Sequence, residues 1–192
     1  MYLTFADYYI DISSKKTKNE MSNLLNKCNT GHIILGDETE YENGYYTIVV
    51  HLDSNKKDLF GIGIISEGHG LIPHILLNSS KKKLFIGFNS ETVIVDCMKK
   101  IVDFRISLNS LFYQFLYLNN PRIILVLHEI GLVALTEEGR EIWKYDGDII
   151  QSYKIEEGNI FLEFLDNEPV KLSLLNGKTL NWFNKDFPTF LA

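Results

Sequence analysis

The sequence predicts an all-β fold that is built from repeated antiparallel sheets and carries one short helix near the N-terminus. The main observation is a repeat of short apolar runs, at Leu84–Phe88, Ile123–Leu127 and Ile160–Phe164. These runs recur at intervals of about 37 to 39 residues, a period typical of repeat architectures. Runs this short, separated by turns rich in Gly, Asn and Asp, favour strands over helices. Each repeat is therefore expected to form a small antiparallel sheet.

An aromatic residue closes each repeat, and the three closing residues are Phe104, Trp143 and Trp182. They lie about 39 residues apart, which supports the same period. We expect one β-repeat domain over residues 1–192, with an N-terminal strand and helix in 1–31 and about four sheet units in 32–192. The two Trp residues should occupy equivalent positions in successive sheets.

The N-terminal residues 2–12 are rich in aromatic and β-branched side chains and predict a strand. The helix follows: Thr17 and Glu20 fit a capping box at its start. Its apolar positions fall at helical spacing on one face, at Met21, Leu24, Leu25 and Cys28. This pattern predicts a short amphipathic helix that packs on a core and ends near residues 29–31.

The first sheet unit begins at His32, where short runs with a period of two replace the helical spacing. The expected strands are 31–37, 45–52, 59–66 and 71–78, separated by turns such as Asn43-Gly44. The fourth has a counterpart before each later repeat, which we interpret as the last strand of one unit leading into the next.

The third repeat is the clearest and has the sequence LVALTEEGREIW at residues 132–143. Its small and apolar strand, acidic turn, Gly139 and Trp143 resemble the blade motif of quinoprotein-type β-propellers. The resemblance covers roughly residues 72–183 and implies a small four-bladed or open β-propeller-like arrangement. The quinoprotein enzymes have a longer ring of blades, so the resemblance does not imply their cofactor, and no cofactor is expected.

Closure of such a ring would protect the strand edges at its two ends. The last unit offers only three strands, so we expect the strand at residues 2–12 to be its fourth. The alternative is an open, curved stack of sheets capped by the Thr17 helix and by the apolar C-terminal tail, which contains Phe183, Phe187, Phe190 and Leu191.

The composition restricts the class of function. The chain of 192 residues has a formal net charge of −6, which disfavours binding to nucleic acid and suits a basic protein partner. Cys28 and Cys97 are too few for a disulfide framework and are interpreted as reduced, half-buried apolar groups. The sequence has no apolar run of the roughly 20 residues that a membrane helix needs and no signal-peptide pattern, so a cytoplasmic location is expected.

Candidate catalytic chemistry is weak. The glycine-rich residues 61–70 lack the glycine register and the following helix of a dinucleotide site, and we expect the glycines to lie where strands approach closely. His69, His74 and the His128-Glu129 pair could gather on one rim as a metal or acid–base site. No recognisable nucleophile accompanies them, so the protein is not expected to be an enzyme or to hold a metal.

The densest charge cluster predicts the partner-binding site, at Asp37, Glu38, Glu40, Tyr41 and Glu42. Carboxylates around a Tyr suit the recognition of a basic protein surface. The predicted function is therefore a non-enzymatic protein-binding module. Its size and acidity are similar to those of bacterial immunity proteins, which neutralise basic toxins. The alternative is a small metal-dependent enzyme or ligand-binding propeller that uses the rim of His69, His74 and His128.

Overall fold

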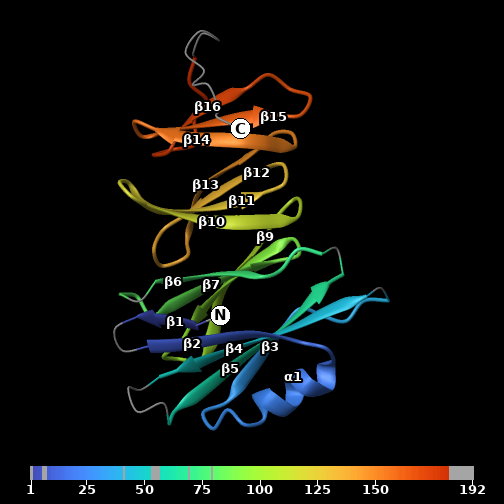
Figure 1. The fold of residues 1–192 in the computed structure, drawn as a ribbon. Coiled ribbons are helices and arrows are strands. Elements are labelled where there is room, and N and C mark those ends of the chain that lie inside the picture. The colour runs from blue at the N-terminus through green and yellow to red at the C-terminus, as the bar shows by residue number, and fades with distance from the viewer. Residues whose placement is uncertain are drawn as a thin grey trace. The chain divides into compact units, whose positions relative to one another are not determined.

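The structure is a computed structural model, and it describes residues 2–5, 8–40, 42–52, 57–68, 70–78 and 80–181 (Figure 1). The described residues form strands and one short helix, which confirms the all-β class. The chain divides into two compact units, Met1–Ser107 and Leu108–Ala192, and each unit is described by itself. The folding of residues 1–192 as a single domain stays a prediction.

The helix α1 (Lys18–Leu25) forms where the capping box predicts it. The hydroxyl of Thr17 accepts a hydrogen bond from the backbone N–H of Glu20 at 3.2 Å. The carboxylate of Glu20 accepts one from the backbone N–H of Lys16 at 3.0 Å. Together these bonds satisfy two backbone donors at the helix start. The helix is shorter than predicted and ends at a C-cap at Asn26. No helix in the described ranges is long and apolar enough to cross a membrane.

The helix packs on a five-stranded sheet of the first unit, and two glycines of that sheet permit the contact (Figure 1). A Cβ at Gly61 would lie 2.8 Å from the Cys28 sulfur, and one at Gly63 would lie 2.8 Å from Leu25 Cδ1. Real Cβ atoms do not come this close, so a larger residue at either position would force these side chains, or the helix, to shift. At Gly61 and Gly63 the glycines therefore serve the approach of the helix and not of another strand, which corrects the prediction there. At Gly68 a Cβ would meet the backbone of Glu42, which lies beside the paired residues Asn43 and Glu67, so that glycine does lie where strands approach closely.

The five-stranded sheet has the order β1-β2-β4-β5-β3, with one parallel pair between β3 and β5. Its strands are β1 (Tyr2–Phe5), β2 (Tyr8–Lys15), β3 (His32–Leu35), β4 (Asn43–His51) and β5 (Leu59–Glu67). The predicted single N-terminal strand is thus two strands that pair as a hairpin.

The partner of the N-terminal strand also differs from the prediction. The strand β2 pairs antiparallel with β4, so it does not complete the last sheet of the chain. Ile10 lies opposite Val50 and Ile12 opposite Ile48, which places both isoleucines on the core face of the sheet. A register that buries an alternating set of apolar side chains is strongly specified, and β4 supplies the matching pattern within the first unit.

The second sheet of the first unit is an antiparallel meander of β6 (His74–Asn78), β7 (Lys83–Phe88), β8 (Glu91–Asp96) and β9 (Ile101–Ser107). Because β6 pairs with β7, it is the first strand of this sheet and not the last strand of the preceding unit. The two sheets of the first unit share one core, which joins Ile48 and Ile62 to Leu84 and Ile86.

The second unit consists of two antiparallel sheets. The first contains β10 (Phe112–Asn119), β11 (Arg122–His128), β12 (Gly131–Leu135) and β13 (Glu141–Asp146). The second contains β14 (Ile150–Glu156), β15 (Asn159–Phe164) and β16 (Val170–Ser173). Their common core includes Leu125, Trp143, Ile160 and Leu172.

The repeat predicted from the sequence is visible in the strand register. Phe104 lies opposite Ile94 in one meander, and Trp143 lies opposite Ala134 in the next. In both strand pairs a β-bulge lies next to this position, between Ile94 and Val95 and between Ala134 and Leu135. The two aromatic residues are therefore structural equivalents. Their burial differs, since Phe104 is 37% exposed and Trp143 only 8%. Trp182 and the apolar tail lie outside the described residues.

Candidate functional site

The acidic segment predicted as a binding site lies in the connection from β3 to β4. Asp37, Glu38, Glu40 and Glu42 are all exposed, whereas Tyr41 lies outside the described residues. The side chain of Asn43 fixes the middle of the connection. Its Oδ1 accepts a hydrogen bond from the backbone N–H of Thr39 at 3.0 Å, and its Nδ2 donates one to the Thr39 carbonyl at 3.1 Å. We call residues 37–42 the acidic loop.

Glu38 differs from the other carboxylates of the acidic loop because it binds within the protein. It forms an ion pair with Lys18 of α1 and accepts a hydrogen bond from the Tyr45 hydroxyl at 2.9 Å. The hydrogen bond from Lys18, followed by that from Tyr45, lowers the pKa of Glu38. The loop is thus tied to the helix and to β4, while Asp37, Glu40 and Glu42 carry the exposed negative charge.

The histidines of the predicted rim have different environments. His69 lies outside the described residues, and His74 is exposed at the start of β6. His128 is 1% exposed at the end of β11, so its ring does not reach the solvent. In the described part of the chain, no three His, Cys, Asp or Glu side chains are close enough together to hold a metal ion.

His128 is instead the buried member of a polar network whose other side chains are half-buried or exposed. Its Nδ1 lies 2.8 Å from the Ser110 hydroxyl, and its Nε2 lies 3.5 Å from a carboxylate oxygen of Asp146. The Ser110 oxygen also accepts the backbone N–H of Ile130 at 3.1 Å, and Asn109 donates to Asp146 at 2.7 Å. Burial lowers the pKa of His128, and the opposing attraction of Asp146 is the smaller effect. The imidazole is therefore neutral near pH 7.

Ser, His and Asp are also the residue types of a hydrolytic triad, but this network lacks the access that catalysis needs. A general base must reach a proton on the substrate or on its nucleophile while the substrate is bound. The ring of His128 is enclosed, and the Ser110 oxygen is engaged by a backbone N–H. The network acts as a structural link that holds the loop before β10 to the turn after β11.

A signal in the sequence could have located this network. His128 closes the β11–β12 hairpin opposite Gly131, as Phe88 closes the β7–β8 hairpin opposite Glu91. In the last sheet, Phe164 pairs with Ile150 in the way that His128 pairs with Phe112. His128 therefore occupies the position that is phenylalanine in the other two repeats. The apolar runs were aligned one residue out of register with the strands, so the sequence comparison did not show this.

The first unit contains a different kind of buried charge. Lys83 is 12% exposed at its side chain and forms ion pairs with Asp96, at 3.0 Å, and with Asp103. Asp96 also accepts hydrogen bonds from the backbone N–H groups of Met98 and Lys99. Because each charge has a partner of opposite sign, these ion pairs link the strands β7, β8 and β9.

The two cysteines are free and buried, as predicted for reduced apolar groups, although they are more than half buried. Burial, together with the nearby charge of Asp96, raises the pKa of the Cys97 thiol to about 12. Burial also raises the pKa of Cys28. Nucleophilic cysteines have lowered pKa values and accessible sulfurs, so neither thiol has the properties of a reactive one.

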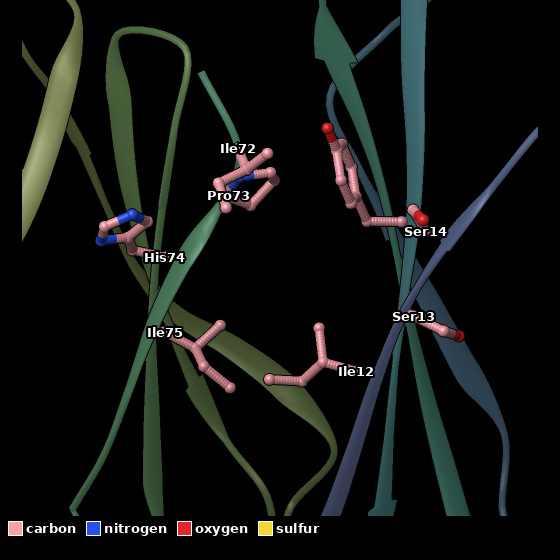
Figure 2. Close-up of a pocket in the computed structure, with 8 residues that line it drawn as sticks. Ile12, Ser13, Ser14, Ile72, Pro73, His74 and Ile75 are labelled. Carbon is pink, nitrogen blue, oxygen red and sulfur yellow. The ribbon is translucent and has the colours of Figure 1, made fainter. Parts of the chain in front are cut away.

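A cleft in the first unit was not predicted from the sequence (Figure 2). It has a volume of about 420 Å³ and lies between the two sheets of that unit. The lining residues come from β2, β4 and β6 and from the segment before β6, and they are Ile12, Ser13, Ser14, Tyr46, Ile72, Pro73, His74 and Ile75. Only the packing of the two sheets brings these distant segments together, which is why no local pattern indicated the cleft.

Comparison with known proteins finds similarity among solved structures alone. No family model matches the sequence, and no curated protein matches it. Among solved structures, the computationally designed Ika4 protein is similar, with a TM-score of 0.45, 13% identity, and coverage of 62% of this chain and 76% of that one. The computationally designed Ika8 protein has a TM-score of 0.47 and 13% identity, and the match covers 75% of this chain and 46% of that one. Similarity at this level indicates neither a family nor a function.

Proposed function

We propose that this protein is a non-enzymatic binding module whose acidic loop recognises a basic protein partner. The observation that carries the proposal is that exposed carboxylates of the loop lie beside residues of the loop that are anchored to the fold. Asp37, Glu40 and Glu42 are exposed, Asn43 binds the backbone of Thr39, and Glu38 is anchored to Lys18. A pre-ordered loop loses less conformational entropy on binding than a flexible one, which favours affinity.

The charge of the whole chain supports the same partner. A net charge of −6 attracts a basic protein over a distance of about 10 Å at 0.1 M salt and steers the encounter. Bacterial immunity proteins, which bind basic toxin domains, are the class of this kind that we propose. The cytoplasmic location and the absence of enzymatic activity belong to this proposal.

The test begins with partner capture from the native host at low salt, followed by association kinetics with the captured protein. We expect the association rate to fall steeply as salt rises, because exposed charges are screened. A triple variant, Asp37→Asn/Glu40→Gln/Glu42→Gln, should associate more than about tenfold more slowly. Its melting temperature should be unchanged because it retains the Glu38–Lys18 anchor.

A second triple variant, with the same net charge as the first one, serves as the matched control. Glu141→Gln/Asp166→Asn/Glu168→Gln removes three exposed carboxylates of the second unit. Equal slowing in both triple variants would show that only net charge matters, and the acidic loop would then not be the site. A partner that binds with a salt-independent rate would also contradict the proposal.

The alternative function is a metal-dependent enzyme or a ligand-binding module that uses the histidines. Of the three predicted histidines, His74 is the one that the structure shows to be exposed, on β6. Titration with Zn²⁺ followed by calorimetry separates the two functions. Stoichiometric binding that is lost in both His69→Ala and His74→Ala would favour the metal site over the acidic loop.

We also propose that the meander sheets are blades of the propeller type, arranged as a small four-bladed or an open ring. The equivalent registers of Phe104 and Trp143, each next to a β-bulge, support this proposal. An experimental structure would test it. Sheets that share no common axis would exclude the propeller arrangement, while leaving the all-β class intact.

A further inference from the structure

The cleft of the first unit has walls that belong to the hydrophobic core. Ile12 on β2 and Ile75 on β6 pack against the buried core of the two sheets. Figure 2 shows their side chains pointing toward each other across the gap, with Ile72 and Pro73 farther along one wall. Tyr46 on β4, which also packs on the core, completes the lining of the cleft. The cleft is therefore an unfilled extension of the core, and an apolar molecule would be favoured there over water.

Strand alternation turns the polar neighbours away from this space. The His74 side chain points away from the gap in Figure 2. Ser13 points away as well, and its hydroxyl lies 2.9 Å from the hydroxyl of Thr47. The interior of the cleft is therefore more apolar than its residue names suggest.

Two hydroxyl groups remain on the cleft side of the sheet, those of Ser14 and Tyr46. They belong to residues that lie opposite each other in the β2–β4 pair. Neither hydroxyl makes a hydrogen bond to another described residue. Among the residues that the structure describes, no Lys, Arg, Asp or Glu lines the cleft. A charged ligand would lose hydration without gaining a counter-charge, whereas a neutral hydroxyl or carbonyl group could bond to either hydroxyl.

From these features we propose that the cleft binds a small, uncharged, apolar molecule that carries a single hydroxyl or carbonyl group. Its hydrocarbon part lies between Ile12 and Ile75, and its polar group lies at Ser14 and Tyr46. The volume of about 420 Å³ falls within the range of about 300 to 1,000 Å³ that small-ligand sites have. This site is independent of the acidic loop, and either proposal can fail alone.

The binding experiment uses the neutral fluorescent probe N-phenyl-1-naphthylamine with the full-length protein. We expect saturable binding of one probe per chain and displacement by octan-1-ol. Octanoate has the same chain length with a charged end, and it should displace the probe at least about tenfold more weakly. Equal or better displacement by octanoate, or no saturable binding, would overturn the proposal.

A pair of variants assigns the binding to the cleft. Ile72→Glu places a charge on a cleft residue that is 62% exposed, so the fold should tolerate it. It should weaken probe binding at least about tenfold. Ile101→Glu makes the same change at another exposed isoleucine of the first unit, 47% exposed and absent from the lining, and should leave binding within about twofold. Equal effects of the two changes would place the probe elsewhere.

A second pair separates the apolar and polar ends of the site. Ile75→Phe adds side-chain volume inside the cleft and should remove probe binding without lowering the melting temperature. Ser14→Ala/Tyr46→Phe should weaken displacement by octan-1-ol several-fold, since a neutral hydrogen bond contributes about 0.5 to 1.5 kcal/mol. Unchanged probe binding in Ile75→Phe, or unchanged displacement in the double variant, would contradict the assigned orientation.

Discussion

The two units both pack one β-sheet on another, but they reach this arrangement from different kinds of sequence. The second unit uses sheets whose strands follow one another along the chain. The first unit has one such sheet and one mixed sheet, in which β2 skips to β4 and β3 pairs parallel with β5. Its mixed sheet also carries the only helix of the described residues. The comparison shows that a repeat predicts the sequential sheets well and the mixed sheet poorly.

The largest expected effect tests whether equivalent positions in the two units contribute equally to the free energy of unfolding. Trp143 is buried, and its Nε1 donates a hydrogen bond to the Leu174 carbonyl at 3.0 Å. Trp143→Ala should reduce the free energy of unfolding by roughly 3 to 5 kcal/mol because it leaves a cavity and an unpaired carbonyl. Urea unfolding followed by circular dichroism measures the change.

Phe104→Ala is the matched control in the first unit, because Phe104 has the same register position but is 37% exposed. We expect a loss of less than about 1.5 kcal/mol there. Equal losses at the two positions would mean that the repeat position, and not burial, determines the contribution of the aromatic residue.

The second prediction concerns the pH dependence of stability, and its test replaces His128 by the residue that the corresponding hairpin of the first unit has. Burial lowers the pKa of His128 in the folded state, so below about pH 6.5 the unfolded chain takes up a proton that the folded protein does not. The free energy of unfolding should therefore fall as the pH falls below about 6.5, by at most about 1.4 kcal/mol per pH unit for this one proton. His128→Phe, which introduces the residue found at position 88, should remove this part of the pH dependence.

The measurement compares unfolding of the wild type and of His128→Phe at pH 7.5 and pH 5.5. Other titrating groups contribute equally to both proteins, so the difference between the two slopes isolates His128. Asp146 is the charged group that faces the ring, and Asp146→Asn should steepen the slope because its attraction opposes the effect of burial. Parallel slopes in the wild type and His128→Phe would contradict the buried neutral state.

The smallest effect concerns the helix that only the first unit has. Thr17→Ala removes the oxygen that accepts the Glu20 N–H, and it should cost about 0.5 to 2 kcal/mol. Thr17→Ser keeps the oxygen and should be nearly neutral. A matching loss in Thr17→Ser would show that the hydroxyl is not what stabilises the helix start.

The parts of the fold that were predictable from sequence depend on neighbouring residues. The capping pair Thr17 and Glu20 fixed the helix start, and the period of the apolar runs identified the hairpins of the meanders. The partner of β2 was not predictable in this way, because the choice between β4 and the last sheet depends on packing between distant segments. The parallel pairing of β3 has the same origin, since β4 intervenes between the two strands.

The candidate sites also differ in whether they depend on neighbouring residues or on contacts between distant segments. The acidic loop is contiguous, so its charge was evident, but the compensation of Glu38 by Lys18 and Tyr45 required the fold. The cleft joins residue 12 to residue 75 and had no local signal. The buried role of His128 was accessible in principle, through comparison of the three repeats at the residue that ends β7, β11 and β15.

The pairing of β2 with β4 has a consequence for the order of folding during synthesis. The 27 residues from 16 to 42 separate the end of β2 at Lys15 from the start of β4 at Asn43. As the chain leaves the ribosome, β2 has no partner but β1 until this stretch, which contains α1 and β3, has followed. The hairpins of the second unit instead close over turns of a few residues, and contacts so local form fastest. The five-stranded sheet is synthesised before the sheets of the second unit, but we expect a longer delay between the synthesis of its first strand and the pairing of that strand. During this delay β2 is exposed, and the nascent chain is most prone to incorrect strand pairing.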